Sequence, residues 1–205
     1  MKRLLENLGK NSPEAYDQIF KTTMPDWFDI RRWKTLLKYY KGGNLVDLGC
    51  LFSQICEMVK DKPGVYLGID EAKEAIERMK LTYNNTRTQF EVGDIYNLDI
   101  EDDIMDYVVL GEVVEHLEYP GGAIKEALRI LKPGGTLAIS TPLEEAKEPG
   151  AVDKDRHIWS FSKHDLELML TPYGNIKFKI LRSRWFPYKY CWPQLLIWVK
   201  KYDKV

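Results

Sequence analysis

The stretch of sequence that decides the fold is NLVDLGCLFSQ, residues 44–54. It begins as an apolar strand, which leads into Asp47 and, two residues later, into Gly49. A turn of this kind between a strand and a helix is typical of nucleotide binding, because glycine lets the backbone approach a ligand closely. Such turns usually carry two further glycines, and those positions here hold Leu51 and Ser53. The stretch therefore predicts a nucleotide-type turn that contains an unusually bulky residue.

Downstream of this turn, short apolar runs alternate with segments of helical periodicity. The runs are residues 45–48, 65–69, 89–92, 107–110 and 136–140, and the helical segments are 53–60, 71–83 and 122–131. Alternation of this kind favours right-handed crossovers and a parallel sheet that is covered on both faces. The last two apolar runs, 176–185 and 194–202, have no helix between them, which favours an antiparallel hairpin. We expect an α/β, Rossmann-like fold: a seven-stranded mixed sheet of five parallel strands plus a C-terminal antiparallel hairpin.

The N-terminal region has a different, helical texture, and we expect residues 1–43 to form a helical cap on the domain that spans residues 44–205. Ser12 and Pro13 are a typical helix start, and a second helix should run from about 26 to 40 and end at Gly42-Gly43. The LKPGG segment, 131–135, predicts a helix stop and a tight turn. Near the other end, Ser162 and Asp165 predict the capped start of a further helix.

Composition restricts the class of protein. The 205 residues carry a formal net charge of −1, which disfavours a broad nucleic-acid surface. No apolar run is long enough to span a membrane, and the three cysteines lack metal-ligand spacing, so we expect a cytoplasmic protein. An aromatic and basic tail leaves an RNA or membrane surface as an alternative to plain strand pairing. It comprises Arg182, Arg184, Trp185, Tyr188, Lys189, Tyr190, Trp192 and Trp198.

Acidic residues follow the predicted strands at their carboxyl ends, where open α/β sheets bind ligands. They are Asp47, Asp70, Asp94 and Glu112. Asp70 lies 23 residues after Asp47, and a carboxylate there is suited to accept hydrogen bonds from two ribose hydroxyls. An acid at the start of the turn repels phosphate and attracts an ammonium group. This combination indicates a nucleoside that carries an amino acid, and S-adenosylmethionine fits that description.

The motifs together resemble the class I S-adenosylmethionine-dependent methyltransferases. The quoted series is VDLGC, GIDEAKEAIE, FEVGDIYNL, MDYVVLGEVVEHLEYP and LRILKPGGTLAISTP, over about residues 44–142. The resemblance is nearest to the branch of ubiquinone-type O-methyltransferases and other small-molecule methyltransferases. It implies S-adenosyl-L-methionine as cofactor and S-adenosyl-L-homocysteine as product. The cofactor-binding residues that it implies are Asp47, Gly49, Cys50, Leu51, Asp70, Glu71, Asp94, Ile95, Gly111 and Glu112.

Leu51 and Ser53 depart from the D/E-x-G-x-G-x-G loop of that family. If the loop keeps its geometry, a leucine at the second glycine costs on the order of 1 kcal/mol. Ser53 is milder, because serine can cap the following helix. We expect the loop to bind the cofactor in a slightly altered geometry, with a non-catalytic relative of the family as an alternative.

Two histidines are candidates for the chemistry. His116 follows the fourth strand and, with His157, suits acid–base catalysis near neutral pH. If residues 112–117 are helical, Glu112, Glu115 and His116 share one face, and with His157 this set would also suit a divalent metal. The sequence alone assigns no metal and leaves the choice between base, substrate contact and structural role open.

Residues 143–161 read as a substrate lid over the site. Its candidate contacts are Arg156, His157 and Trp159, and the opposite wall should include Tyr16, Trp27 and Arg31 or Arg32. We therefore expect methyl transfer to oxygen or nitrogen of a small-molecule acceptor, with nucleic acid an unlikely partner. An RNA methyltransferase is the alternative. The identity of the acceptor and the oligomeric state are not encoded in any recognisable motif.

Overall fold

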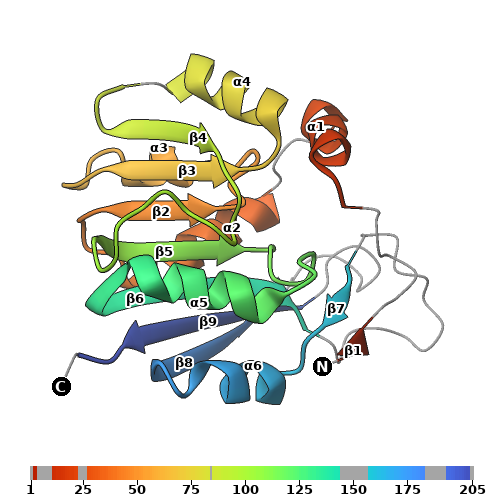
Figure 1. The fold of residues 1–205 in the computed structure, drawn as a ribbon, viewed down its shortest axis with the longest axis vertical. Coiled ribbons are helices and arrows are strands. Elements are labelled where there is room, and N and C mark those ends of the chain that lie inside the picture. Colours follow the sequence, from red (N-terminus) through yellow and green to blue (C-terminus); the bar gives the residue numbers. More distant parts are fainter. Residues whose placement is uncertain are drawn as a thin grey trace.

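The computed structural model describes residues 2–3, 11–22, 27–83, 85–143, 157–182 and 193–203. Its centre is a seven-stranded sheet in the order β4-β3-β2-β5-β6-β9-β8 (Figure 1). The strands are β4 (Thr88–Val92), β3 (Tyr66–Asp70), β2 (Leu45–Leu48), β5 (Met105–Gly111), β6 (Leu131–Pro142), β9 (Gln194–Lys201) and β8 (Gly174–Leu181). The first five are parallel, and β9 is antiparallel to both of its neighbours. The predicted fold class is confirmed.

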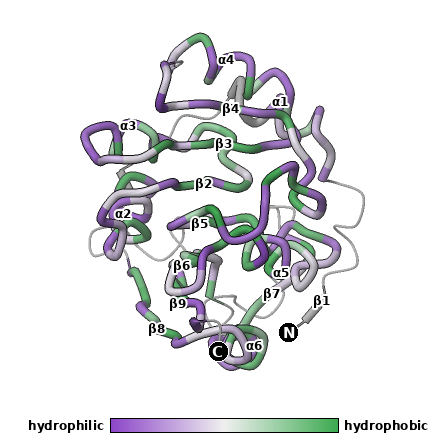
Figure 2. The backbone as a smooth tube through the Cα atoms, turned by 60° about the vertical axis from the view of Figure 1, so that its left-hand side comes forward, coloured by the Kyte–Doolittle hydropathy of each residue, from purple (hydrophilic) through white to green (hydrophobic). Residues whose placement is uncertain are grey.

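Helices cover both faces of this sheet. They are α1 (Pro13–Thr22), α2 (Trp27–Leu36) with the 3-10 turn η2 (Leu37–Tyr39), α3 (Ile55–Val59), α4 (Lys73–Tyr83), α5 (Pro120–Ile130) and α6 (Lys163–Leu170). The first apolar cluster joins α5 and α6 to one face, and the second joins α2, α3 and α4 to the other. Hydrophobic residues dominate the middle of β3 and β5, whereas hydrophilic residues gather in outer turns and helix faces (Figure 2). The parallel strands are therefore buried from both sides, as the continuous apolar runs predicted.

Several local predictions are confirmed and others are wrong in detail. Ser162 and Asp165 form a complete capping box at the start of α6. The LKPGG segment ends α5 as expected, but it continues directly into β6 instead of forming a separate tight turn. A register shift opposite Met105/Tyr107 accommodates this change of direction. A short strand pair, β1 (Lys2–Arg3) with β7 (Trp159–Ser160), was not predicted, because two-residue strands leave no periodic pattern.

The described part of the C-terminal tail belongs to the core. Trp198 is 3% exposed, and its indole N–H donates to the carbonyl of Leu36 at 2.8 Å. Strand pairing therefore accounts for this aromatic residue. The other predicted aromatic residues of the tail, with Arg184 and Lys189, lie outside the described residues. Within the described ranges, no helix is long and apolar enough to cross a membrane.

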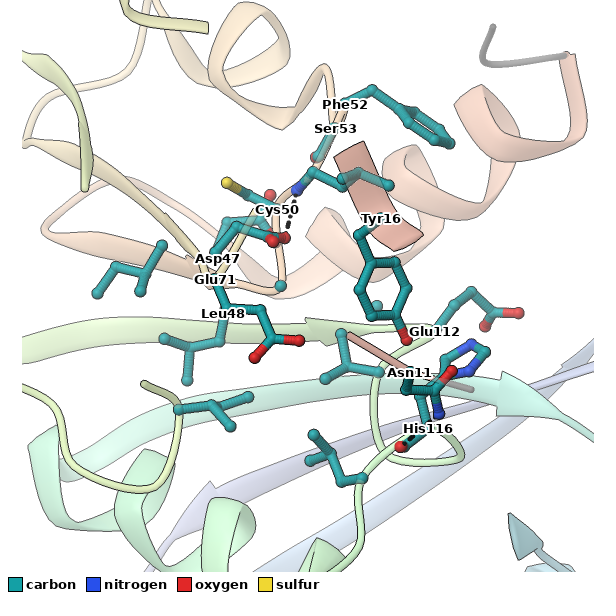
Figure 3. Close-up of a pocket in the computed structure, with 18 of the residues that line it drawn as sticks. Asn11, Tyr16, Asp47, Leu48, Cys50, Phe52, Ser53, Glu71, Glu112 and His116 are labelled. Carbon is teal, nitrogen blue, oxygen red and sulfur yellow. Dashed lines mark hydrogen bonds between the residues drawn. The ribbon is translucent and has the colours of Figure 1, made fainter. Parts of the chain in front are cut away.

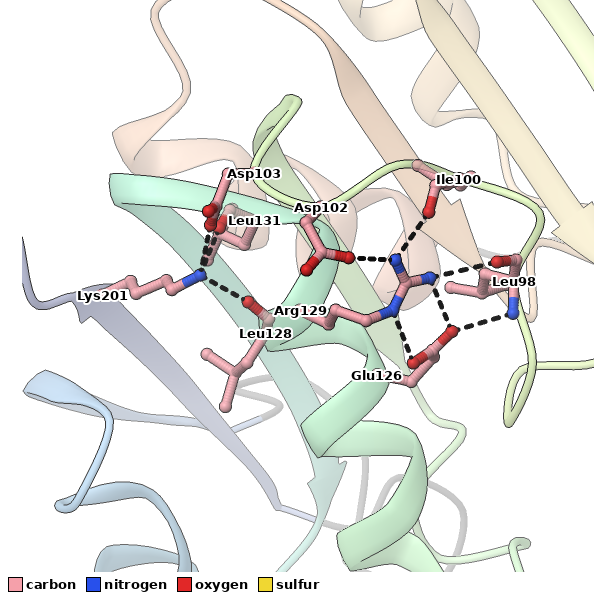
Figure 4. A network of polar contacts seen from close by, with 9 residues as sticks. All are labelled: Leu98, Ile100, Asp102, Asp103, Glu126, Leu128, Arg129, Leu131 and Lys201. Atoms are coloured by element: carbon pink, nitrogen blue, oxygen red, sulfur yellow. Dashed lines mark hydrogen bonds and ion pairs between the residues drawn. The ribbon is translucent and has the colours of Figure 1, made fainter. Parts of the chain in front are cut away.

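A polar network ties the loop before β5 to the last turns of α5 (Figure 4). Arg129 donates to the carbonyls of Leu98 and Ile100 at 3.0 and 2.7 Å, and it pairs with Glu126 and Asp102. Lys201 on β9 donates to two carbonyls at the end of α5 and to Asp103. These contacts hold the loop before β5 and the end of β9 against α5. They therefore stabilise the end of the sheet opposite the cavity.

Candidate functional site

A cavity of about 860 Å³ lies at the carboxyl ends of β2, β3 and β5. Every residue that the sequence analysis assigned to cofactor or catalysis lines it: Asp47, Gly49, Cys50, Leu51, Asp70, Glu71, Asp94, Ile95, Gly111, Glu112, His116 and His157. Figure 3 shows the Glu71 carboxylate and the Tyr16 hydroxyl directed into the same space, with His116 and Asn11 at its far end. Glu71 therefore lies on one side of the cavity, and His116 lies on the other side together with Glu112.

The turn after β2 is held by backbone hydrogen bonds to the neighbouring strand. The amides of Gly49 and Cys50 both donate to the carbonyl of Ile69, at 2.8 and 3.1 Å. Gly49 has φ +74°, and a Cβ there would lie 2.5 Å from Val113. Leu51 has φ +30°. The leucine therefore adopts a positive φ at the position where the family carries its second glycine, as the sequence analysis anticipated.

The strain at Leu51 gives a first prediction. Leu51→Gly and Leu51→Ala both remove the side chain, but only glycine accepts the positive φ without a Cβ penalty. We expect Leu51→Gly to unfold with a free energy about 1 kcal/mol higher than Leu51→Ala. Urea denaturation of the two variants at one pH measures this difference. Equal stability, or a more stable alanine variant, would show that the turn stores no strain at this residue.

Asp70 holds this turn in place through its carboxylate. Oδ2 accepts from the amide of Leu51 at 2.8 Å, and Oδ1 accepts from the amide of Ala72 at 2.9 Å. The side chain is buried, with the residue 8% exposed, and burial raises its pKa. Glu71, directly beside it, is exposed and also lines the cavity. Burial and the neighbouring charge of Asp70 raise the pKa of Glu71 as well.

Asp47 lies beneath the turn and is 3% exposed. Its Oδ2 accepts a hydrogen bond from the hydroxyl of Tyr66 at 3.0 Å. Burial raises the pKa of Asp47 to about 7, although hydrogen bonds from Ser53 and Tyr66 act in the opposite direction. Ser53 also accepts from the amide of Ile55 at 3.2 Å, but Gln54, and not Ser53, is the N-cap residue of α3. Near neutral pH, Asp47 can therefore change its charge in response to a ligand.

The pKa of Asp47 predicts a pH dependence of stability. An unfolded aspartate ionises near pH 3.8, whereas the folded group keeps its proton up to about pH 7. Between these values the folded state binds more protons, so stability falls as pH rises. Relative to Asp47→Asn, the wild type should lose up to ~1.4 kcal/mol per pH unit in that window and no more above it. Urea unfolding of both proteins across pH 4–8 tests this; a constant difference would contradict the raised pKa.

Asp94 shapes the turn after β4. Its Oδ1 accepts from the amide of Tyr96 at 2.8 Å, and its carbonyl accepts from the amide of Asn97 at 3.0 Å. This is a local Asx-type turn, so one carboxylate oxygen already serves the backbone. Tyr96 also lines the cavity, and the amide of Tyr119 donates to its hydroxyl at 3.1 Å. Sequence reasoning missed Tyr96, because tyrosine in a loop carries no distinctive signal.

Glu112 and the residues up to 117 are not helical, so the condition for a shared helix face over 112–117 is not met. The φ of Glu112 is +60°, and its Oε1 accepts from the hydroxyl of Ser140 at 2.7 Å. Arg32 approaches its other oxygen to 4.0 Å and pairs with Asp29 at 2.7 Å. Burial raises the pKa of Glu112, while the charge of Arg32 opposes this shift. Of the two arginines predicted for this wall, Arg32 lines the cavity.

The same segment brings Glu115 and His116 beside His157. Their potential metal-ligand atoms all lie within 4.8 Å of one another, and the two imidazole centroids are 4.8 Å apart. The amides of residues 158 and 159 donate to the carbonyl of Glu115 at 2.7 and 3.0 Å. Trp159 also donates its indole N–H to the carbonyl of Leu117 at 2.8 Å. Tertiary contacts between two loops therefore create the cluster, and helical spacing does not.

Asn11 and helix α1 form part of the cavity wall beside His116. Asn11 donates to the carbonyl of His116 at 2.9 Å, and the Tyr16 ring meets the imidazole of His116 edge-on at 6.2 Å. Asn11 was missed, because 105 residues separate it from its partner. The predicted contacts Trp27 and Arg156 cannot be placed: the side chain of Trp27 and all of Arg156 lie outside the described residues.

Comparison with known proteins agrees with this geometry. A family model described as "Methyltransferase domain" matches residues 46–139, which contain the cavity-lining strand ends. A protein of Mycolicibacterium smegmatis named as a probable S-adenosylmethionine-dependent methyltransferase is 27% identical over 53% of this chain and 42% of its own. Norajmaline N-methyltransferase of Rauvolfia serpentina is 28% identical, over 54% of this chain and 40% of its own length.

Two further similarities extend this comparison. The tRNA U34 carboxymethyltransferase of Desulfotalea psychrophila is 26% identical over 64% of this chain and 43% of its own. The chain spans less than half of the length of each of these three curated relatives. Among solved structures, a chain from the complex between the Haloferax volcanii Trm112 methyltransferase activator and a methyltransferase superposes with a TM-score of 0.72. It is 19% identical, and the match covers 91% of this chain and 98% of that one.

Proposed function

We propose that the chain is a class I, S-adenosylmethionine-dependent methyltransferase that acts on oxygen or nitrogen of a small-molecule acceptor. The match of residues 46–139 to a methyltransferase-domain model supports this proposal. One observation carries the proposal: a single cavity joins buried carboxylates of β2 and β3 to two imidazoles, one after β5 and one just before β7. Carboxylates match the sulfonium, ammonium and ribose hydroxyls of the cofactor, and imidazoles match an acceptor that loses a proton.

The residues present fit the cofactor by their chemistry. Gly49 lines the cavity with φ +74°, and its missing side chain lets the turn pack against Val113 beside the cavity. We propose that Asp70 and Glu71 bind the ribose hydroxyls and that Asp94 and Ile95 contact the adenine. Arg32 is the cation that we assign to the cofactor carboxylate. S-adenosylmethionine supplies an electrophilic methyl group when it is bound.

The chain itself has to orient the acceptor and remove its proton. His116 and His157 are the side chains that we propose for this role, since a neutral imidazole accepts a proton near pH 7. Positioned proton transfer typically contributes 10²- to 10⁴-fold to a rate. Tyr16 of α1 and Asn11, which precedes that helix, are proposed to exclude water from the same space, because both line the cavity.

An RNA acceptor is a second candidate, supported by one specific feature. Lys177 and Lys179 alternate on the exposed edge strand β8, and Arg182 follows at its end. Exposed lysines on an edge strand also protect a sheet from aggregation, which is the simpler explanation. The tRNA relative keeps the RNA candidate open, while the net charge of −1 favours the small-molecule acceptor.

A methyl-transfer assay separates these possibilities. The full chain is incubated with methyl-labelled S-adenosylmethionine and either a size-filtered metabolite extract or total RNA, and the labelled product is then fractionated. We expect label in a small molecule. Label in RNA would support the second candidate. If the chain binds the cofactor but forms no S-adenosylhomocysteine with either pool, the chain is a non-catalytic relative and the proposal fails.

A further inference from the structure

Two rows of basic side chains lie on one face of the molecule. The first row lies on α2 and η2, and the second lies on β8 and the residue after it. The rows comprise Arg31, Lys34, Lys38, Lys177, Lys179 and Arg182. Spacings of three and four residues place the first three on one side of the helical segment, and alternation places Lys177 and Lys179 on one face of the strand. We call these six side chains the basic strip.

Two contacts join the rows near their ends. The guanidinium of Arg31 donates to the carbonyl of Arg182 at 2.9 Å. At the other end, Nζ of Lys38 and Nζ of Lys177 lie 5.1 and 4.9 Å from the centroid of the same Tyr39 ring. The rows therefore run side by side, and each brings a cation to both ends of the strip.

The basic strip has no acidic partners in the part of the chain that the structure describes. None of its six side chains forms an ion pair there, whereas Lys60, Lys132 and Lys201 each lie 2.8–3.0 Å from a carboxylate oxygen. The single acidic residue of α2, η2 and β8 is Asp29, which pairs with Arg32 at 2.7 Å. Positive charge is thus concentrated on this face, although the net charge of the chain is −1.

Protection of the sheet edge does not account for the whole strip. Lysines on an edge strand discourage pairing with another chain, and this role is sufficient for Lys177 and Lys179. It requires no cations on a helix, yet α2 and η2 carry a row of the same size. A second function has to explain why the two rows lie together.

The composition of this face selects the kind of partner. Leu181 packs in the apolar cluster of α2, so the odd-numbered side chains of β8 face α2, and Ile180, which is 41% exposed, lies on the other face. Among the described side chains of α2, η2 and this face of β8, no large apolar group is exposed. Protein interfaces have an apolar core and interfacial membrane binding buries apolar groups, whereas nucleic-acid phosphates are held largely by charge.

We propose that the basic strip binds the phosphate backbone of single-stranded nucleic acid. The strand row spans about 17 Å and the helical row about 10 Å, so the strip covers several successive phosphates of one strand. It begins beside the cavity, because Arg32, next to Arg31, lines that cavity. This binding goes beyond the proposed methyl transfer and does not depend on it: the strip holds the strand whether or not the strand is the acceptor.

Salt-dependent binding of a fluorescent oligouridylate to the tag-free full chain tests the strip. Anisotropy is measured between about 50 and 200 mM salt, without S-adenosylmethionine. We expect log K to fall against log [salt] with a slope of about −4, since each phosphate contact of a single strand contributes about −0.7. The double variant Lys34→Gln/Lys179→Gln should make this slope shallower by about 1.4 and weaken binding about 25-fold at ~100 mM salt.

Lys125→Gln/Lys163→Gln is the matched control. It has the same net charge as the first double variant, but its exposed lysines lie on α5 and α6, which pack on the opposite face of the sheet. It should bind the oligonucleotide as the wild type does. Thermal unfolding should leave both double variants folded, because all four lysines are exposed.

Three results would overturn the basic strip as a nucleic-acid site. They are absence of oligouridylate binding at about 50 mM salt, an equal loss in both double variants, and tighter binding to phosphatidylserine vesicles than to the oligonucleotide. The last result would assign the strip to a membrane surface. S-adenosylmethionine binding, measured separately by calorimetry, reports on the proposed function, so either proposal can fail without the other.

Discussion

Asp70→Asn is expected to lower the affinity for S-adenosylmethionine by more than about 100-fold, which corresponds to a loss of about 2.7 kcal/mol. The carboxylate accepts from the amides of Leu51 and Ala72, at 2.8 and 2.9 Å. Hydrogen bonds to a charged group are worth about 1.5–3 kcal/mol each, and the asparagine NH₂ would point a donor at one of these amides. The substitution therefore releases the turn that carries Leu51 and also removes a proposed ribose contact.

Calorimetric titration at one pH, together with thermal unfolding, measures the effect of Asp70→Asn. Glu71→Gln is the matched control, because Glu71 is exposed and its change should cost about tenfold or less. If Asp70→Asn binds the cofactor as tightly as the wild type, neither bracing of the turn nor ribose binding can be its role. A larger loss in Glu71→Gln than in Asp70→Asn would move the ribose contact to Glu71.

Gly49→Ala is expected to reduce the free energy of unfolding by about 2–5 kcal/mol. Gly49 has φ +74°, which costs a residue with a Cβ about 1–2 kcal/mol. The new Cβ would also lie 2.5 Å from Cγ2 of Val113, and relief of such overlap typically costs about 1–3 kcal/mol. Both residues line the cavity, so the shift that relieves the overlap should weaken cofactor binding as well.

Gly121→Ala is the matched control for this substitution. Gly121 lies in α5, and a Cβ there would meet no heavy atom within 4 Å. Since alanine is the better helix former, that variant should be as stable as the wild type or more stable by up to ~1 kcal/mol. Urea denaturation compares all three proteins. A Gly49→Ala variant with wild-type stability would show that the turn tolerates a side chain at its tightest point.

The sequence carried enough information to predict the sheet and the residues that line the cavity at the ends of β2 and β3. Strand ends are set by short apolar runs, and ligands lie beyond the carboxyl ends of parallel strands, so Asp47, Asp70 and Glu112 could be placed by position alone. The positive φ of Leu51 shows that the turn keeps the backbone sign of the expected glycine, a case that the sequence had left conditional. These features are local or follow from fold topology, which is why one sequence is sufficient to predict them.

The other end of the cavity depends on contacts that no local pattern encodes. Residues 112–117 are not helical, and backbone bonds from residues 158 and 159 to Glu115 hold the segment of His157 beside His116. The bond between Asn11 and His116 joins segments 105 residues apart. The proposed acceptor side therefore has to be inferred from the tertiary structure, whereas the proposed cofactor side follows from the order of the strands.

A crystal structure of the chain with S-adenosylhomocysteine tests the central claim most directly. The account predicts one molecule in the cavity, with its ribose hydroxyls within hydrogen-bond distance of Asp70 or Glu71 and its sulfur on the side of His116. A ligand bound elsewhere, or a cavity without ligand at saturating concentration, would contradict the proposed methyltransferase site while leaving the fold unchanged.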